Sequence, residues 1–279
     1  MTELATARNA TRQAAEPGAR FIDLISAEWM KLWSLRSTVW VLLLSALGVV
    51  AANVNAAYAD YRNFPDYDAT TQAAFAPGWA AWDAFISLAA TLVILAMSSL
   101  GAISIVGEYT SGLNRTTFAA VPSRGAVMTA KIVVIGFVTT VFGVLVASLS
   151  FWATQAILSG RHAGISIGEP GALRLVAGSA LLAPLSALIG MGLGALIRTT
   201  AATLVTATLG LVILPMALND DKYWAAVFAH TMPRVAWGRL TELEPGSGPA
   251  TLSHYPWTVG GGVDRLRRLD RDVDPRRHH

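Results

Sequence analysis

The amino-acid sequence predicts an all-α polytopic membrane helix bundle, and three observations favour this fold class. First, 53% of the 279 residues are hydrophobic and only 14% are charged, whereas a soluble domain usually carries about 25% charged residues. Second, five apolar stretches approach the ~20 residues that a helix needs to cross a bilayer. Third, the charged residues gather between these stretches, as is typical of chains that cross a membrane several times.

The five apolar stretches lie at about 39–58, 84–106, 132–158, 173–197 and 201–218. We expect each to be a transmembrane helix, since a helix satisfies its own backbone hydrogen bonds in lipid. The connector after the first span holds four aspartates against Arg62 alone, so the positive-inside rule places it outside. Little more than Arg198 separates the fourth span from the fifth, which predicts a short cytoplasmic turn. This pattern predicts a cytoplasmic N-terminus.

Residues 20–37 form a different kind of segment, with apolar side chains at helical spacing and polar ones on the other side. Trp29 and Trp33 beside Lys31 and Arg36 suit an amphipathic helix that lies on membrane lipid at headgroup level. The alternative is that this segment is the cytoplasmic end of the first span.

The remaining segments complete the expected domain organisation. Residues 1–19 lack apolar periodicity, which predicts a disordered cytoplasmic tail. Residues 20–218 form the transmembrane domain, 219–263 an extracytoplasmic or re-entrant segment, and 264–279 a charged C-terminal tail. Three interpretations of this end stay open: a tail outside the membrane, re-entry of 249–263, or a missing final span.

The composition and motifs weigh against several function classes. There is no cysteine, and no HExxH, GxSxG or paired metal-ligand spacing occurs, so we expect neither an enzyme nor a metal site. There is no GxxxxGK[ST], so the chain is not expected to bind ATP by a P-loop. The basic residues flank spans instead of forming one patch, which disfavours a nucleic-acid partner.

Polar residues within predicted spans are the default candidates for a substrate path. Asn53 and Asn55 in the first span and Gln155 in the third are such candidates, although interhelical hydrogen bonds would explain them equally well. We expect no deeply buried acid or base, which disfavours ion-coupled transport.

The fourth and fifth spans contain residues that shape helix packing. Gly190 and Gly194 form a GxxxG face for close helix packing, either within the subunit or across a dimer. Pro184 and Pro215 are expected to kink their helices, which suits either moving or static helices.

Residues 107–131, GEYTSGLNRTTFAAVPSRGAVMTAK, separate the second and third spans. Three basic residues, Arg115, Arg124 and Lys131, outnumber the single acid Glu108, so we expect a cytoplasmic loop that projects into water.

Two segments of the chain resemble bacterial ABC transporter permeases of the ABC-2 type. The first leads into the first span with a pattern like E-W-x-K-L-x-S-L-R-S-T, matched here by Glu28, Trp29, Lys31, Leu32, Ser34, Leu35, Arg36, Ser37 and Thr38. The second follows the second span with a pattern like E-Y-x-x-G-x-x-R-T-T-x-A-A-x-P-x-R, matched by Glu108, Tyr109, Gly112, Arg115, Thr116, Thr117, Ala119, Ala120, Pro122 and Arg124, with Lys131 opening the next helix.

The resemblance implies a multi-pass permease subunit of an ATP-driven exporter in the bacterial cell membrane, homodimeric or paired with a similar subunit. A separate cytoplasmic ABC ATPase, which would bind ATP and Mg, is implied to couple to the loop at 107–131. The family's six helices imply a sixth span that is missing here. The alternative is a non-transporting membrane protein, such as an immunity or scaffold factor or a truncated permease remnant.

Overall fold

The computed structural model describes residues 20–76, 78–111, 124–218, 227–229 and 231–241. These residues form helices, turns and loops, which confirms the all-α fold class. Five of the helical stretches are long and apolar enough to cross a membrane: Arg36–Asp66, Gly78–Tyr109, Arg124–Ser159, Ala172–Ile197 and Thr200–Ala217. They coincide with the five spans predicted from the sequence. The predicted tails at 1–19 and 264–279 lie outside the described residues.

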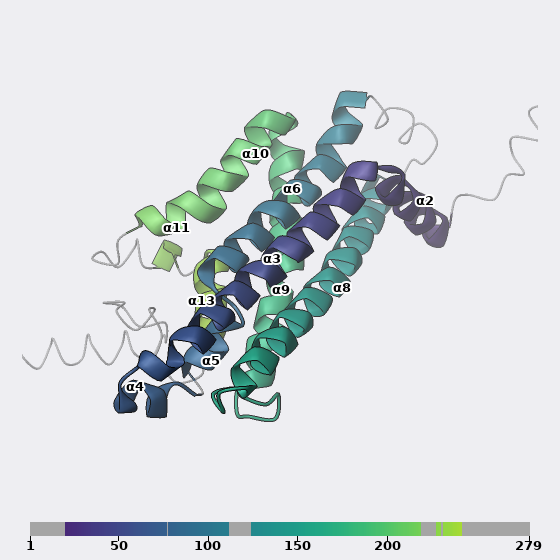
Figure 1. The fold of residues 1–279 in the computed structure, drawn as a ribbon. Coiled ribbons are helices and arrows are strands. Elements are labelled where there is room, and N and C mark those ends of the chain that lie inside the picture. Colours follow the sequence, from purple (N-terminus) through teal and green to yellow (C-terminus); the bar gives the residue numbers. More distant parts are fainter. Residues whose placement is uncertain (1–19, 77, 112–123, 219–226, 230, 242–279) are drawn as a thin grey trace, which may run out of the picture.

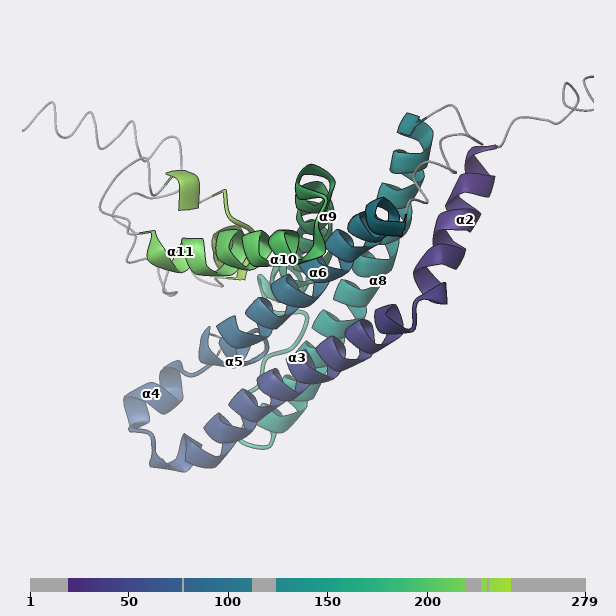
Figure 2. The same ribbon diagram turned by 90° about the horizontal axis from the view of Figure 1, so that it is seen from above.

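The long helices pack side by side into one bundle (Figures 1 and 2). In chain order they are α2 (Phe21–Ser34), α3 (Arg36–Asn63), α6 (Ser87–Ser111), α8 (Arg124–Ser159), α9 (Ala172–Ile197) and α10 (Thr200–Thr208). Helix α9 lies against both α6 and α8 at the centre, while α3 covers α6 and α8 from another side. Helix α10 lies at the edge of the bundle away from α2 (Figures 1 and 2).

The outer face of α3 carries large apolar side chains that no other described segment of the chain covers. Trp40, Leu43, Leu44 and Leu47 are all more than half exposed. In water such a stripe would be costly, at about 25 cal/mol per Å² of apolar surface. Against hydrocarbon tails the cost disappears, so this face suits contact with lipid.

The closest helix contact in the bundle involves glycines of α6 and α9. A Cβ atom added to Gly190 would lie 2.0 Å from the backbone oxygen of Ser98, and one added to Gly101 would lie 1.9 Å from that of Ala187. Gly194 meets Ala102 of α6 less tightly, at 3.1 Å. The predicted GxxxG face therefore packs within the subunit, where the absence of side chains lets the two backbones touch.

The fifth predicted span is irregular near its proline. A π-helical turn, η2 (Leu209–Ile213), separates α10 from α11 (Leu214–Ala217), and Pro215 lies in the first turn of α11. A proline lacks a backbone donor and disturbs the preceding turn of helix, which agrees with this break. Pro184, by contrast, lies buried inside a continuous α9.

Two short helices and a turn close one end of the bundle between α3 and α6. They are η1 (Phe64–Asp66), α4 (Ala69–Ala74) and α5 (Gly78–Asp83). Phe75 is buried beneath this cap, where its ring packs against those of Phe64 and Tyr67 at centroid distances of 5.4 and 6.3 Å. This second small core fixes the path of the chain from the first span to the next.

Part of the segment at 219–263 folds back onto the bundle. Helix α13 (Pro233–Thr241) packs against α9, where the indole N–H of the buried Trp237 donates a hydrogen bond to the Ser179 hydroxyl at 3.0 Å. A Cβ added to Gly178 would lie 3.0 Å from the side chain of Leu240. Local sequence patterns did not predict this helix, because it is short, has few apolar positions and contains Pro233 and Gly238.

The contact between α6 and α9 generates a prediction with a matched control. We expect Gly190→Ala to lower the free energy of unfolding by about 1–3 kcal/mol, as for other overpacked sites, because the new methyl group meets backbone that cannot move aside. Gly192→Ala makes the same chemical change in the same helix, but nothing lies within 4 Å of its Cβ. Thermal unfolding in one detergent compares the two variants. Equal midpoints would contradict the described contact.

Candidate functional site

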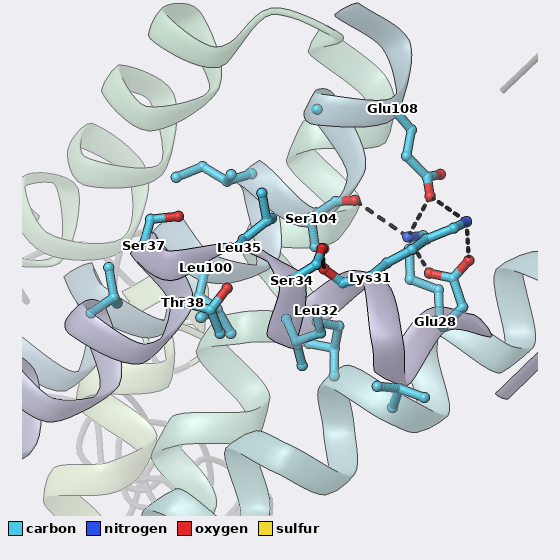
Figure 3. Close-up of a pocket in the computed structure, with 16 residues that line it drawn as sticks. Glu28, Lys31, Leu32, Ser34, Leu35, Ser37, Thr38, Leu100, Ser104 and Glu108 are labelled. Carbon is cyan, nitrogen blue, oxygen red and sulfur yellow. Dashed lines mark hydrogen bonds and ion pairs between the residues drawn. The ribbon is translucent and has the colours of Figure 1, made fainter. Parts of the chain in front are cut away.

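Four charged side chains from three helices meet in one cluster, which we call the ion cluster: Glu28, Lys31, Glu108 and Lys131 (Figure 3). The ammonium group of Lys131 lies 2.5 Å from a carboxylate oxygen of Glu28 and 2.9 Å from one of Glu108. That of Lys31 lies 2.6 Å and 3.1 Å from the same two carboxylates. Each lysine thus bridges both glutamates, and the two positive charges balance the two negative ones.

The local sequence explains how these charges reach one another. Glu28 and Lys31 are three residues apart on α2, so both lie on the same face of that helix. Leu35 has an extended backbone between α2 and α3, which turns α2 out of the line of α3 and back along α8 (Figure 2). Trp29 then packs against Phe137 of α8, with ring centroids 6.3 Å apart. Helix α2 is therefore held against the bundle and turns its charged face inward.

Burial makes the cluster strong and also costly to break. The exposed fractions of the side chains are 5% for Glu28, 7% for Lys131 and 14% for Glu108. Lys131 can donate three hydrogen bonds, and all three are made, the last to the backbone oxygen of Ser104 at 3.3 Å. A buried charge with every donor satisfied is the condition under which an ion pair can offset its desolvation.

Lys31 differs from Lys131 because 37% of its side chain is exposed. Burial by itself lowers the pKa of Lys31, but hydrogen bonds to Glu28 and Glu108 and the charges of both carboxylates outweigh it, so the pKa of Lys31 is raised above its ordinary value. A raised lysine pKa means that the stabilisation is fully present at neutral pH. It is lost only as the pH rises through the folded-state value in strongly alkaline solution.

A cavity of about 300 Å³ lies beside the ion cluster, between α2, α3, α6 and α8. Apolar side chains form most of its wall, and the cluster and several hydroxyl groups form the rest (Figure 3). Its lining includes Leu32, Leu35, Thr38, Leu100, Ser104 and Ile135. The ion cluster can hold α2, α6 and α8 together. Because each lysine pairs with both glutamates, the ion pairs can also rearrange if these helices move.

The structure corrects the predicted boundaries of the loop at 107–131. Helix α6 continues to Ser111 and α8 begins at Arg124, so Glu108, Tyr109, Arg124 and Lys131 are helical. Glu108 and Lys131 point into the ion cluster instead of projecting into water. The prediction was wrong because charge balance alone cannot tell a solvated loop from helix ends whose charges pair internally.

The other coupling residues divide into two groups. The ring of Tyr109 lies 5.3 Å from the guanidinium of Arg198, whose backbone has a φ of 62° at the end of α9. This contact links α6 to the turn before α10. The predicted coupling residues Gly112, Arg115, Thr116, Thr117 and Pro122 lie outside the described residues.

The residues predicted for the interfacial helix lie on α2 and at the start of α3. Trp29 and Trp33 are 41% and 39% exposed on α2, with ring centroids 5.7 Å apart. Arg36 is exposed at the start of α3. The ammonium group of Lys31 bridges Glu28 and Glu108, an arrangement that the amphipathic pattern did not predict.

The three predicted substrate-path residues do not gather in one place. The Asn53 amide is buried, where it donates to the Ser150 hydroxyl at 3.1 Å and accepts from the Ile86 backbone at 3.1 Å. Gln155 donates to the Ala80 backbone oxygen and accepts from the Ile165 backbone, both at 2.8 Å. Asn55 is exposed on α3. Asn53 and Gln155 thus hydrogen-bond to other segments of the bundle. This was the alternative to a role in a substrate path.

The expectation of no deeply buried acid or base was wrong. Glu28, Lys131 and Asp83 are all buried. Glu28 and Asp83 were missed as site residues because each stands in a short segment beside a span, where charges usually face water. The signal that could have identified Glu28 was its i,i+3 spacing to Lys31, which predicts an ion pair on one face of the amphipathic helix. For Asp83 the sequence carried no such signal.

Comparison of the chain with protein-family models, with curated proteins and with solved structures finds no match. The resemblance to ABC-2 permeases therefore stays a prediction from the two sequence motifs.

The ion cluster generates a second prediction. Lys131→Met keeps most of the side-chain length but leaves two buried carboxylates with Lys31 alone, so we expect a loss of about 3–5 kcal/mol in stability, as for other broken buried pairs. Lys31→Met is the matched control and should cost less, because its ammonium group is partly solvated. Thermal unfolding of both variants at neutral pH measures the difference. A larger loss for Lys31→Met would contradict the described burial.

Proposed function

We propose that the chain is the membrane-spanning permease subunit of an ATP-driven exporter of the ABC-2 type. It would pair with a second permease subunit in the bacterial cell membrane. A separate cytoplasmic ATPase would bind ATP and Mg and would dock at the connector between α6 and α8. This chain would supply the path for the substrate and no catalytic residue.

One observation carries the proposal: the two motifs that resemble the family meet in the ion cluster. Glu28 and Lys31 belong to the first motif, Glu108 begins the second, and Lys131 lies in the helix that follows the second. Two segments about 80 residues apart in sequence thus share one set of charges. An arrangement of this kind suits a coupling element, in which a movement imposed at one helix end is transmitted to several helices.

The physical chemistry of the cluster suggests how such coupling would work. Buried charges cannot separate without leaving one of them unpaired in a poorly solvated place. A partner that moved the connector between α6 and α8 would therefore move α2 with both helices. Rigid-body motion of packed helices is a common basis of switching between two states, and here it would open the bundle alternately to the two sides of the membrane.

The first test is whether an ATPase accompanies the chain. We expect a P-loop ATPase to co-purify with it in mild detergent from its native membrane, and Arg115→Glu to reduce that association because it reverses a charge in the connector. Arg62→Glu makes the same charge change at the exposed last turn of α3, at the opposite end of the bundle, and serves as the control.

The outcomes of this test separate the two candidate functions. Loss of the ATPase with Arg115→Glu but not with Arg62→Glu supports the exporter. Purification of a stable, folded chain with no ATPase would contradict it and would favour a non-transporting membrane protein.

A further inference from the structure

A second buried acidic group lies at the other end of the bundle from the ion cluster. Asp83 is the last residue of α5 and is 4% exposed. Its Oδ2 atom has no hydrogen-bond donor among the described residues, and it is the one buried side-chain polar atom there that lacks a partner. A buried carboxylate oxygen without a partner carries an uncompensated desolvation penalty.

The neighbour of Asp83 is another acid. The carboxyl group of Asp60, in the last turn of α3, interacts with that of Asp83 both through its charge and as a hydrogen-bonding partner. Two carboxylates repel each other, and they can share a hydrogen bond only if a proton lies between them. Carboxyl pairs of this kind titrate together, with one proton held by the pair.

No positive charge is seen to balance the pair. None of the ion pairs among the described residues includes Asp60 or Asp83. Helix α5 packs against α3 and α8; Tyr61 of α3, Gln155 of α8, and Tyr67 and Arg161, which follow η1 and α8, carry polar groups at this end of the bundle. Arg161 donates to the backbone oxygen of Tyr61 and stacks on its ring at 4.6 Å, and Gln155 donates to the backbone oxygen of Ala80.

The Tyr67 hydroxyl contacts the acid pair through Asp60. It donates a hydrogen bond to Asp60 at 2.8 Å. This hydrogen bond, with burial and the charge of Asp60 beside it, raises the pKa of Tyr67 above its ordinary value. Asp60 therefore acts as an acceptor toward Tyr67.

We propose that Asp60 and Asp83 form a proton-binding site that holds α5 against the end of α3. With the proton bound, Asp83 donates to Asp60 and the buried oxygen gains its missing partner. When the proton leaves, two negative charges face each other in a buried place, and the helix ends are driven apart. Helix α5 leads directly into α6, so protonation sets how that end of α6 is held. This proposal does not depend on the exporter function.

The direction of the pH dependence follows from linkage. A folded chain that keeps a proton which the unfolded chain has released binds more protons, so its stability falls as the pH rises. We expect the unfolding midpoint of the full chain in lipid nanodiscs to fall from mildly acidic to mildly alkaline pH. Asp83→Asn imitates the protonated acid and should remove most of this fall. Asp66→Asn, an exposed acid of the same cap, is the control and should keep it.

Infrared difference spectroscopy of the unaltered chain tests the site without any variant. We expect the C=O stretch of one protonated carboxyl per chain at neutral pH, lost on alkaline titration and absent in Asp83→Asn. Absence of that band in the unaltered chain would overturn the proposal. Stabilisation of the unaltered chain by Na⁺ or Ca²⁺ at alkaline pH, absent in Asp83→Asn, would also overturn it, since a metal cation would then occupy the place of the proton.

Discussion

The pairing of two lysines with two glutamates at the junction of α2, α6 and α8 is the interaction on which the rest of the structure depends. Apolar packing in lipid is weakly directional, because hydrocarbon tails compete equally well for an apolar side chain. Buried charges are different, since only one arrangement satisfies them. Lys131 uses all three of its donors within the bundle. This junction therefore fixes the position of α2, which apolar contacts alone would leave free to lie elsewhere on the membrane surface.

Close packing of small residues complements this junction in the middle of the bundle. The glycines of α6 and α9 bring two backbones into contact, and Gly143 of α8 makes a similar approach to Ala180 of α9, where an added Cβ would lie 2.1 Å from the backbone oxygen. Helix α9 is thereby held on two sides by contacts that tolerate no added methyl group. A bundle fixed by charges at one end and by glycines in the middle can move as a unit, which is the property that the proposed coupling requires.

Much of the fold could be predicted from the sequence, because length and apolarity alone define a span. The five spans, the amphipathic helix before the first and the short turn at Arg198 all follow from such local signals. The ion cluster could not be predicted as a cluster, although three of its four residues were candidates. Its formation depends on the bend at Leu35 and on how far α6 and α8 extend. Local hydropathy predicts neither of these features. Helix α13 and the buried Asp83 were missed for the same reason: their burial comes from packing with distant segments.

The central claim is that the ion cluster holds α2 in one position against α8, and a distance measurement tests it most directly. The chain has no cysteine, so cysteines introduced at the exposed positions Met30 on α2 and Val133 on α8 can be spin-labelled without further changes. Pulsed electron–electron double resonance of the labelled chain in nanodiscs should give one narrow distribution of the distance between the two labels. Lys131→Met should broaden or shift this distribution. The same distribution with and without Lys131 would contradict the account, because α2 would then be positioned by apolar packing alone.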